Sequence, residues 1–257
     1  MQLKLSRIFF VAAICSALLA MPAFADSTSV KVGVDKNMEA ELMTPDGPGP
    51  YPAVLVLHTS RGMQSADMEF AKRLTQEGYV ALVPYFLQAY GIAAKTRQAT
   101  FTTYADPIYA DFVACLEFLK QNEKVDGKKL GAVGFSNGGY FALWLAATGK
   151  VQAGVSYYGA VTGAGTDPSL NRFRQTFTGT SSPTLFFHGT DDSKVPFKKA
   201  VELDSILTAA QSNHEFYQYP GAQHNFDRFG GSNNELAAAD AWRHTQSFFG
   251  KLLKDQP

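Results

Sequence analysis

Cysteine is nearly absent from this sequence, which contains only Cys15 and Cys115 among its 257 residues. Cys15 lies in an N-terminal apolar segment with the pattern of a cleavable leader, so the rest of the chain keeps one thiol and cannot form an internal disulfide. A small domain held together by disulfides is therefore excluded, and stability must come from a hydrophobic core. Hydrophobic residues make up 46% of the sequence, which is enough for such a core, and we expect a single domain.

An excess of charge of either sign is also missing. The 23 basic and 23 acidic side chains balance, and loss of the leader would remove Lys4 and Arg7, leaving 21 basic against 23 acidic residues and a net charge of −2. A protein so close to neutrality has no general attraction to nucleic acid or to an anionic membrane, so we expect neither as a partner. Clusters of histidine, cysteine and carboxylate with the spacing of metal ligands are absent from the sequence, and we expect no metal and no organic cofactor.

Apolar runs long enough to cross a membrane are lacking as well, because a spanning helix needs about 20 residues. The run over residues 8–20 is preceded by the two basic residues of the leader and followed by Ala-Phe-Ala at 23–25. This is the pattern of a secretory signal peptide, and we expect cleavage of residues 1–25, a mature domain over 26–257 and a secreted or periplasmic location without stable membrane insertion. An uncleaved membrane anchor is the alternative interpretation.

From residue 26 onward, apolar strand patterns alternate with helical ones. The segments SVKVGV and MEAELMTP alternate in polarity and predict an antiparallel strand pair. Unbroken apolar strands, typical of a parallel sheet covered on both faces, follow in YPAVLVLH, YVALVPYF, KKLGAVGF, VQAGVSYYGAV and PTLFFHGT. The predicted fold class is α/β, a doubly wound and mostly parallel sheet with helices on both faces.

Two segments do not fit this alternation. Residues 87–100 form a polar stretch that is too long for a simple connection, and loops of that length often carry function. Residues 162–182, from Thr162 to Ser182, have an irregular pattern and contain Phe173 and Phe177. We expect this second segment to form a wall of a substrate pocket.

The most informative stretch is GFSNGG at residues 134–139, which stands between an apolar strand pattern and a helical one. A strand, a glycine-flanked serine and a helix together form the nucleophile elbow, in which the serine sits on a sharp turn. Glycine two residues before and two residues after the serine relieves the crowding at that turn. Ser136 is therefore the candidate nucleophile, and the helix after it directs free N–H groups toward a developing oxyanion.

A serine hydroxyl needs a base within hydrogen-bond reach and a third group that orients the base. In a doubly wound sheet such groups lie in loops at the carboxyl ends of strands. Of the five histidines, His224 in the loop PGAQHNF meets this condition best, and the loop HGTDDSKVP offers Asp191 and Asp192 as the acid. The order serine, acid, histidine is the one that α/β-hydrolases use.

The sequence resembles the dienelactone hydrolase family of α/β-hydrolases over nearly all of the expected mature chain. The resemblance is carried by GFSNGG, by SYYGAV on the next strand, by HGTDDSKVP and by YPGAQHNF. It implies an α/β-hydrolase fold, with Asp192 as the acid, His224 as the base and Asp191 as a turn residue. It also implies that the backbone N–H groups of Ser60 and Asn137 form the oxyanion hole.

The sequence departs from the name-giving enzyme of the family at two linked positions. That enzyme has cysteine at the elbow and a glutamate that interacts with it, where this chain has Ser136 and Thr59. Both changes favour an ordinary serine esterase. The family binds its substrate's carboxylate with arginines, and by position Arg228 is a candidate for one of them, a solvated loop arginine being the alternative. Arg97, in the long polar stretch, is a candidate for the other.

The resemblance and the residues together predict a serine hydrolase that cleaves a small carboxylic ester or lactone through an acyl-enzyme. Its partner would be a small-molecule substrate, and the natural substrate and the oligomeric state stay open. A peptidase or thioesterase with the same Ser-His-Asp triad is an alternative, since the elbow does not discriminate between leaving groups. A non-catalytic binding protein on the same scaffold is a second alternative, although such proteins usually lose a member of the triad.

Overall fold

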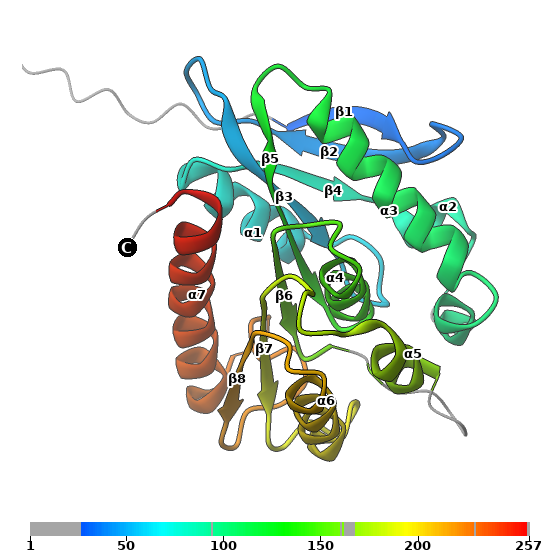
Figure 1. Ribbon diagram of the computed structural model, residues 1–257, viewed down its shortest axis with the longest axis vertical. Coiled ribbons are helices and arrows are strands. Elements are labelled where there is room, and N and C mark those ends of the chain that lie inside the picture. Colours follow the sequence, from blue (N-terminus) through cyan, green and yellow to red (C-terminus); the bar gives the residue numbers. More distant parts are fainter. Residues whose placement is uncertain (1–26, 94, 160, 162–167, 229, 256–257) are drawn as a thin grey trace, which may run out of the picture.

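A computed structural model describes residues 27–93, 95–159, 161, 168–228 and 230–255. Its centre is an eight-stranded sheet with the order β1-β2-β4-β3-β5-β6-β7-β8 (Figure 1). β1 and β2 pair antiparallel and β2 joins β4 antiparallel, whereas all other neighbours are parallel. The strands are β1 Ser27–Val32, β2 Met38–Met43, β3 Tyr51–Leu57, β4 Val80–Pro84, β5 Val125–Phe135, β6 Ala153–Tyr157, β7 Thr184–Gly189 and β8 His214–Tyr219.

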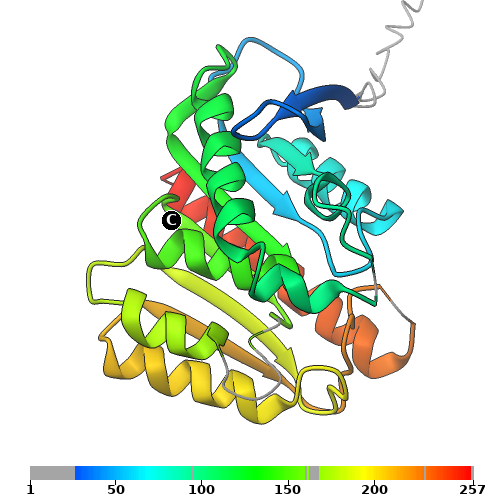
Figure 2. The ribbon, with the colours of Figure 1, turned by 90° about the vertical axis from the view of Figure 1, so that its right-hand side faces the viewer.

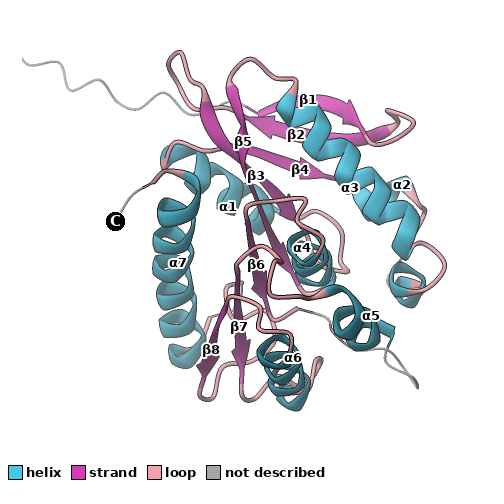
Figure 3. Cartoon of the chain, in the orientation of Figure 1, coloured by secondary structure: helices cyan, strands magenta, loops and turns pink. Residues whose placement is uncertain are grey.

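Helices cover both faces of this sheet (Figures 1 and 2). The helices α1 and α7 pack on one face, and α3, α4, α5 and α6 pack on the other, each face with its own hydrophobic cluster. Figure 3 shows the long α7 on one side of the strands and α3, α4 and α6 on the opposite side. The helices are α1 Ser65–Gln76, α2 Phe86–Ala89, α3 Ala105–Lys120, α4 Asn137–Ala147, α5 Pro168–Thr176, α6 Phe197–Ala209 and α7 Ser232–Leu253, with a 3₁₀ helix η1 at Arg97–Phe101.

The predicted fold class is confirmed, because the unbroken apolar runs became the central parallel strands. In β3 every residue after Tyr51 and Pro52 is buried, and all five residues of β4 and of β6 are buried as well. Burial on both faces explains the absence of polar alternation in these strands. The strands β3, β5, β7 and β8 run in the same direction, so their carboxyl ends lie on the same side of the sheet. The loops that follow these four strands meet there.

The two irregular segments have more structure than the sequence pattern predicted. The polar stretch at 87–100 overlaps α2 and most of η1. The prediction of an irregular chain at 162–182 was wrong for α5, which buries Leu170 and Phe173 three residues apart, with Phe177 packed against Phe173 just after the helix. Residues 162–167 of that segment and the predicted signal peptide at 1–25 lie outside the described residues.

Within the described ranges, no helix has both the length and the apolar character required to pass through a bilayer.

Candidate active site

Ser136 stands at the junction of β5 and α4, in a backbone conformation that few residues other than glycine adopt. Its φ is 52° and its ψ is −111°. The neighbouring glycines permit this turn: a Cβ at Gly134 would lie 2.1 Å from the carbonyl oxygen of Gly138, and a Cβ at Gly138 would lie 2.0 Å from that of Leu57. Strained serine geometry of this kind is characteristic of the nucleophile elbow.

The structure brings the three predicted side chains together. The hydroxyl of Ser136 is 3.1 Å from Nε2 of His224, and Nδ1 of His224 is 2.7 Å from Oδ2 of Asp192. These residues are separated by as many as 88 positions in the chain and come from the loops after β5, β7 and β8. The distances are those of a serine, a base and an orienting acid in one hydrogen-bonded line.

The loops that carry the acid and the histidine are fixed to each other. The amide of Asp191 donates to the carbonyl of Ala222 at 3.0 Å, and the amide of Gly221 donates to the hydroxyl of Thr190 at 2.9 Å. A Cβ at Gly189 would lie 2.1 Å from the oxygen of Ala222, so only glycine permits this approach. The side chain of Asp191 is exposed and accepts a hydrogen bond from Thr190, which leaves Asp192 as the carboxylate of the site.

Asp192 is buried and receives its hydrogen bonds from several directions. Its side chain has 0% exposure, and Oδ1 accepts the backbone amides of Lys194 and Val195, both at 2.8 Å. Burial alone would raise the pKa of this carboxyl, but hydrogen bonds from His188 and His224 outweigh burial and hold the pKa well below its usual range. Asp192 is therefore ionised beside His224, as an orienting acid must be.

The other histidines lie outside the line of proton transfer. His58 is buried at the end of β3, stacks on Phe86 with 4.0 Å between ring centroids, and donates from Nδ1 to the carbonyl of Thr59. Burial lowers the pKa of His58 to about 4, so this imidazole is neutral. His214 begins β8 and contacts Asp204, and His244 lies within α7 beside Asp240.

His188 is closer to the site than the sequence indicated. Its Nε2 lies 2.9 Å from the carbonyl oxygen of Val195 and 3.2 Å from Oδ2 of Asp192. A histidine at the end of an apolar strand is more often packed or hydrogen-bonded than catalytic, and His188 is both buried and hydrogen-bonded. The spacing of four residues to Asp192 was the available signal for a contact with the acid.

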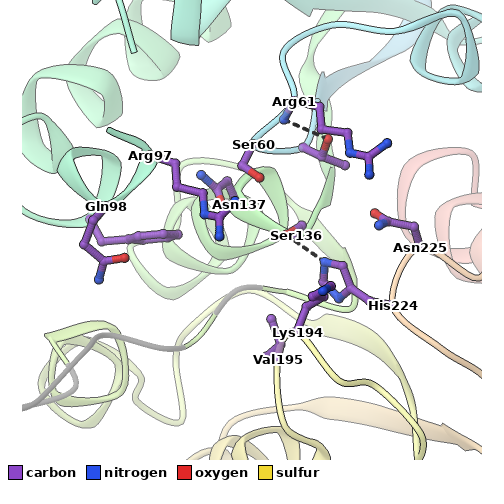
Figure 4. A pocket seen from close by; sticks show the side chains of 12 residues that line it. Ser60, Arg61, Arg97, Gln98, Ser136, Asn137, Lys194, Val195, His224 and Asn225 are labelled. Carbon is purple, nitrogen blue, oxygen red and sulfur yellow. Dashed lines mark hydrogen bonds between the residues drawn. The ribbon is translucent and has the colours of Figure 1, made fainter. Parts of the chain in front are cut away.

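A cavity of about 460 Å³ opens over Ser136. Figure 4 shows Arg97 and Asn137 on one side of Ser136 and His224 and Asn225 on the other. Ser60 and Asn137, whose backbone N–H groups are the predicted oxyanion donors, both line this cavity. The described residues that line the cavity are Thr59, Ser60, Arg61, Arg97, Gln98, Phe101, Ser136, Asn137, Lys194, Val195, His224 and Asn225.

Among the described residues that line the cavity, three side chains are cationic and none is acidic. Arg61 follows β3, Arg97 begins η1, and Lys194 comes from the loop after β7. Arg97 thus lines the cavity, and its contact with substrate stays a prediction. Arg61 and Lys194 were not identified from the sequence, although both stand within three residues of a predicted site residue. The positive charge of the cavity favours an anionic group on a bound molecule.

Arg228 does not line this cavity. The structure therefore does not place it where it could contact a substrate bound at Ser136. Its side chain is 6% exposed, and Nη2 lies 2.5 Å from Oδ1 of Asp67 in α1. Nε donates to the hydroxyl of Tyr158 at 3.2 Å, and the guanidinium lies over the ring of Phe135. The buried carboxylate of Asp67 attracts the guanidinium away from the cavity.

The described part of the segment that was expected to wall the cavity, residues 168–182, does not line it, and Phe173 and Phe177 lie elsewhere. Phe173 is fully buried and packs against Tyr140 of α4, with 5.4 Å between ring centroids. Phe177 packs against Phe173 in the same hydrophobic cluster. Phe101, which ends η1, provides the aromatic wall instead.

The described part of the chain contains no group of three or more histidine, cysteine, aspartate or glutamate side chains arranged to hold a metal ion. The one remaining thiol of the described residues, Cys115, is buried in α3, and burial raises its pKa far above the usual value.

Comparisons with known proteins agree on one family. The model of the dienelactone hydrolase family matches residues 38–253. A "Putative carboxymethylenebutenolidase" of Synechocystis sp. is 31% identical over 231 residues, covering 83% of this chain and 91% of the relative.

Solved structures show the same fold. The crystal structure of a "Putative Dienelactone Hydrolase" from Klebsiella pneumoniae has a TM-score of 0.77 at 23% identity and covers 88% of this chain and 98% of that one. A dienelactone hydrolase-like promiscuous phosphotriesterase from metagenomic libraries has a TM-score of 0.73 at 23% identity, covering 90% and 99%.

Proposed function

Because the chain belongs to the dienelactone hydrolase family, we propose that it is a serine hydrolase that cleaves a small carboxylic ester or lactone. The observation that carries the proposal is the hydrogen-bonded line from Ser136 through His224 to Asp192, with distances of 3.1 and 2.7 Å. These distances support the proposal, because acyl transfer by a serine needs a nucleophile, a base and an orienting acid in one hydrogen-bonded line.

In the first half of the reaction Ser136 Oγ attacks the ester carbonyl while its proton passes to Nε2 of His224. The carbonyl oxygen becomes an oxyanion, and the backbone N–H groups of Ser60 and Asn137 stabilise it at the N-terminus of α4. The bond to the leaving alcohol then breaks, and His224 returns the proton to the departing oxygen. Asp192 holds His224 in the tautomer with hydrogen on Nδ1 and stabilises its transient positive charge.

In the second half a water molecule replaces the alcohol. His224 takes a proton from the water, whose oxygen attacks the acyl carbon, and the bond between that carbon and Ser136 Oγ breaks. His224 then returns the proton to Ser136, and the carboxylic acid leaves. For a lactone the alcohol and the acid are parts of one product molecule.

The cavity supports a small substrate that carries a negative charge. A volume of about 460 Å³ falls in the usual range for small-molecule sites. Arg97, exposed at the rim, can bind a carboxylate through two parallel hydrogen bonds, and Arg61 and Lys194 add to the positive potential. A substrate carboxylate would therefore be held by η1 and the loops after β3 and β7, rather than by Arg228.

Export of the enzyme is a separate part of the proposal and rests on the sequence of the leader. A mature chain that begins at Asp26 would act outside the cytoplasm without a membrane anchor. Intact-mass measurement of protein secreted to the periplasm of an expression host tests this, because a mature N-terminus elsewhere than near Asp26 contradicts it.

Labelling with a fluorophosphonate probe tests the nucleophile. We expect the wild-type protein to be labelled and Ser136→Ala to be folded and unlabelled. Hydrolysis of p-nitrophenyl acetate, compared with a lactone, a thioester and a peptide panel, then decides the class of acyl substrate. A folded wild-type protein that neither reacts with the probe nor turns over any of these substrates would contradict the proposed function.

A further inference from the structure

The carboxylate of Asp192 contacts two imidazoles, although the mechanism uses only one. Oδ2 lies 2.7 Å from Nδ1 of His224 and 3.2 Å from Nε2 of His188. Both His188 and Asp192 have side chains exposed by 2% or less, so solvent does not compete for this oxygen. Oδ1 is occupied by the amides of Lys194 and Val195.

The surroundings of His188 decide which of its nitrogens carries hydrogen. Nε2 faces two oxygen acceptors, the carbonyl of Val195 at 2.9 Å and the carboxylate of Asp192 at 3.2 Å. An unprotonated Nε2 would place its lone pair against both oxygens in the protein interior, which is unfavourable. Nε2 therefore holds a hydrogen that it shares between Val195 and Asp192.

We propose that His188 is a positioning residue that shares Oδ2 of Asp192 with His224 and thereby limits how strongly the acid stabilises the protonated base. The proposal rests on the proposed function, since it assigns a role within that triad. Hydrogen bonds to a carboxylate disperse its charge, so a donor from His188 leaves less charge on Oδ2 for His224. The same bond ties Asp192 to His188 in β7, and together with the amides on Oδ1 it fixes the direction of Oδ2.

The direction of the effect follows from this competition. Without the His188 donor, Oδ2 is a stronger acceptor for Nδ1 of His224, and the imidazolium form of His224 gains stability. Because His224 must be neutral to accept the proton of Ser136, activity would then be lost at a higher pH on the acid side of the profile. The proposal thus makes a prediction about pH as well as about rate.

Other charged or titratable groups lie near the pair but make their contacts elsewhere. Lys194 points into the cavity from the loop after β7. The ring of Tyr158 meets that of His224 with 4.8 Å between centroids, and its hydroxyl donates to Asp227 and accepts from Arg228. A shift on substitution of His188 is therefore assigned to the loss of its own hydrogen bond.

The experiment measures kcat/KM for p-nitrophenyl acetate against pH in three variants. For His188→Leu we expect the acid limb, the fall in kcat/KM toward low pH, to move up by about 0.5 to 1 pH unit. We also expect kcat to decrease by a larger factor than the factor by which KM changes. His188→Gln retains an N–H donor near the position of Nε2, and we expect its limb to stay at the wild-type pH. His214→Leu is the matched control, because it removes an imidazole that also lies 3.2 Å from a carboxylate, Asp204, but away from the site.

An unchanged limb in His188→Leu, or an equal shift in His188→Gln, would overturn the proposal. If His188→Leu does not fold, long-range ¹H–¹⁵N correlation spectra of the wild-type protein give a second test. Hydrogen on Nε2 of His188, with the signal assigned by its loss in His188→Gln, supports the proposal, and hydrogen on Nδ1 alone overturns it. The spectra do not require activity, so this result is distinct from failure of the proposed function, which fluorophosphonate labelling reports.

Discussion

Arg228 and Asp67 form an ion pair in the protein interior, with 2.5 Å between Nη2 and Oδ1 and side-chain exposures of 6% and 0%. Asp67 lies in the first turn of α1, where its other oxygen accepts the amide of Gln64 at 2.8 Å. Arg228 follows His224 by four residues. The pair therefore fastens the loop of the catalytic histidine to the start of a helix on one face of the sheet.

The first prediction concerns the stability of this pair. Arg228→Met leaves the carboxylate of Asp67 buried without its partner, and we expect the free energy of unfolding to fall by about 3 to 5 kcal/mol. Chemical denaturation at pH 7 measures the change, and Arg228→Met with Asp67→Asn should recover part of it. Lys120→Met is the control, since its exposed pair with Glu117 contributes about 1 kcal/mol or less. Full stability of Arg228→Met with a raised KM would return Arg228 to the role of a substrate contact.

A second prediction concerns Arg97. Arg97→Gln removes a cation from the cavity rim, and we expect KM for an anionic ester such as p-nitrophenyl hemisuccinate to rise about tenfold. KM for neutral p-nitrophenyl acetate should change little, because that ester offers no carboxylate. Gln98→Ala, a change at the neighbouring lining residue, serves as the control. An equal rise in KM for both esters would show that Arg97 affects the shape of the cavity but does not bind the carboxylate of the substrate.

The fold was predictable because the central strands are buried on both faces and need nearly continuous apolar sequence. The helix α5 was missed because polar residues surround Leu170 and Phe173, and its apolar face is only a few residues long. Such a short amphipathic segment gains its stability from packing, here of Phe173 on Tyr140, which local sequence does not reveal.

In the candidate site, too, some residues could be predicted from the sequence and others could not. Ser136 and His224 were identifiable because each stands in a loop with its own turn residues, and the choice of Asp192 over Asp191 needed the family motif. The position of Arg228 was not predictable, because its partner Asp67 lies 161 residues earlier in the chain. Long-range ion pairs leave no periodic signal in a sequence, so a solvated, a substrate-bound and a buried arginine look alike there.

A third prediction tests the turn at the nucleophile. Gly134→Ala would place a Cβ 2.1 Å from the carbonyl oxygen of Gly138, a clash with backbone that no side-chain rotation relieves. We expect a loss of about 3 kcal/mol or more in the free energy of unfolding, and little fluorophosphonate labelling of any folded fraction. The control is Gly179→Ala, where the nearest atom would be 3.5 Å away and stability should change by about 0.5 kcal/mol or less. Wild-type labelling and stability of Gly134→Ala would refute the assigned turn geometry.

The last prediction concerns the pH dependence of stability and rests on His58. Burial lowers the pKa of His58 to about 4, whereas the pKa of an unfolded histidine is about 6.5. The unfolded chain therefore binds a proton in this window that the folded chain does not, so this contribution to stability is complete above pH 6.5 and is lost as the pH falls toward 4. The difference corresponds to a loss of about 3 kcal/mol across the window. We expect urea denaturation to show a smaller decline between pH 7 and pH 4.5 in His58→Gln than in the wild type or in the control His214→Gln. Parallel declines in all three proteins would contradict a lowered pKa of His58 in the folded protein.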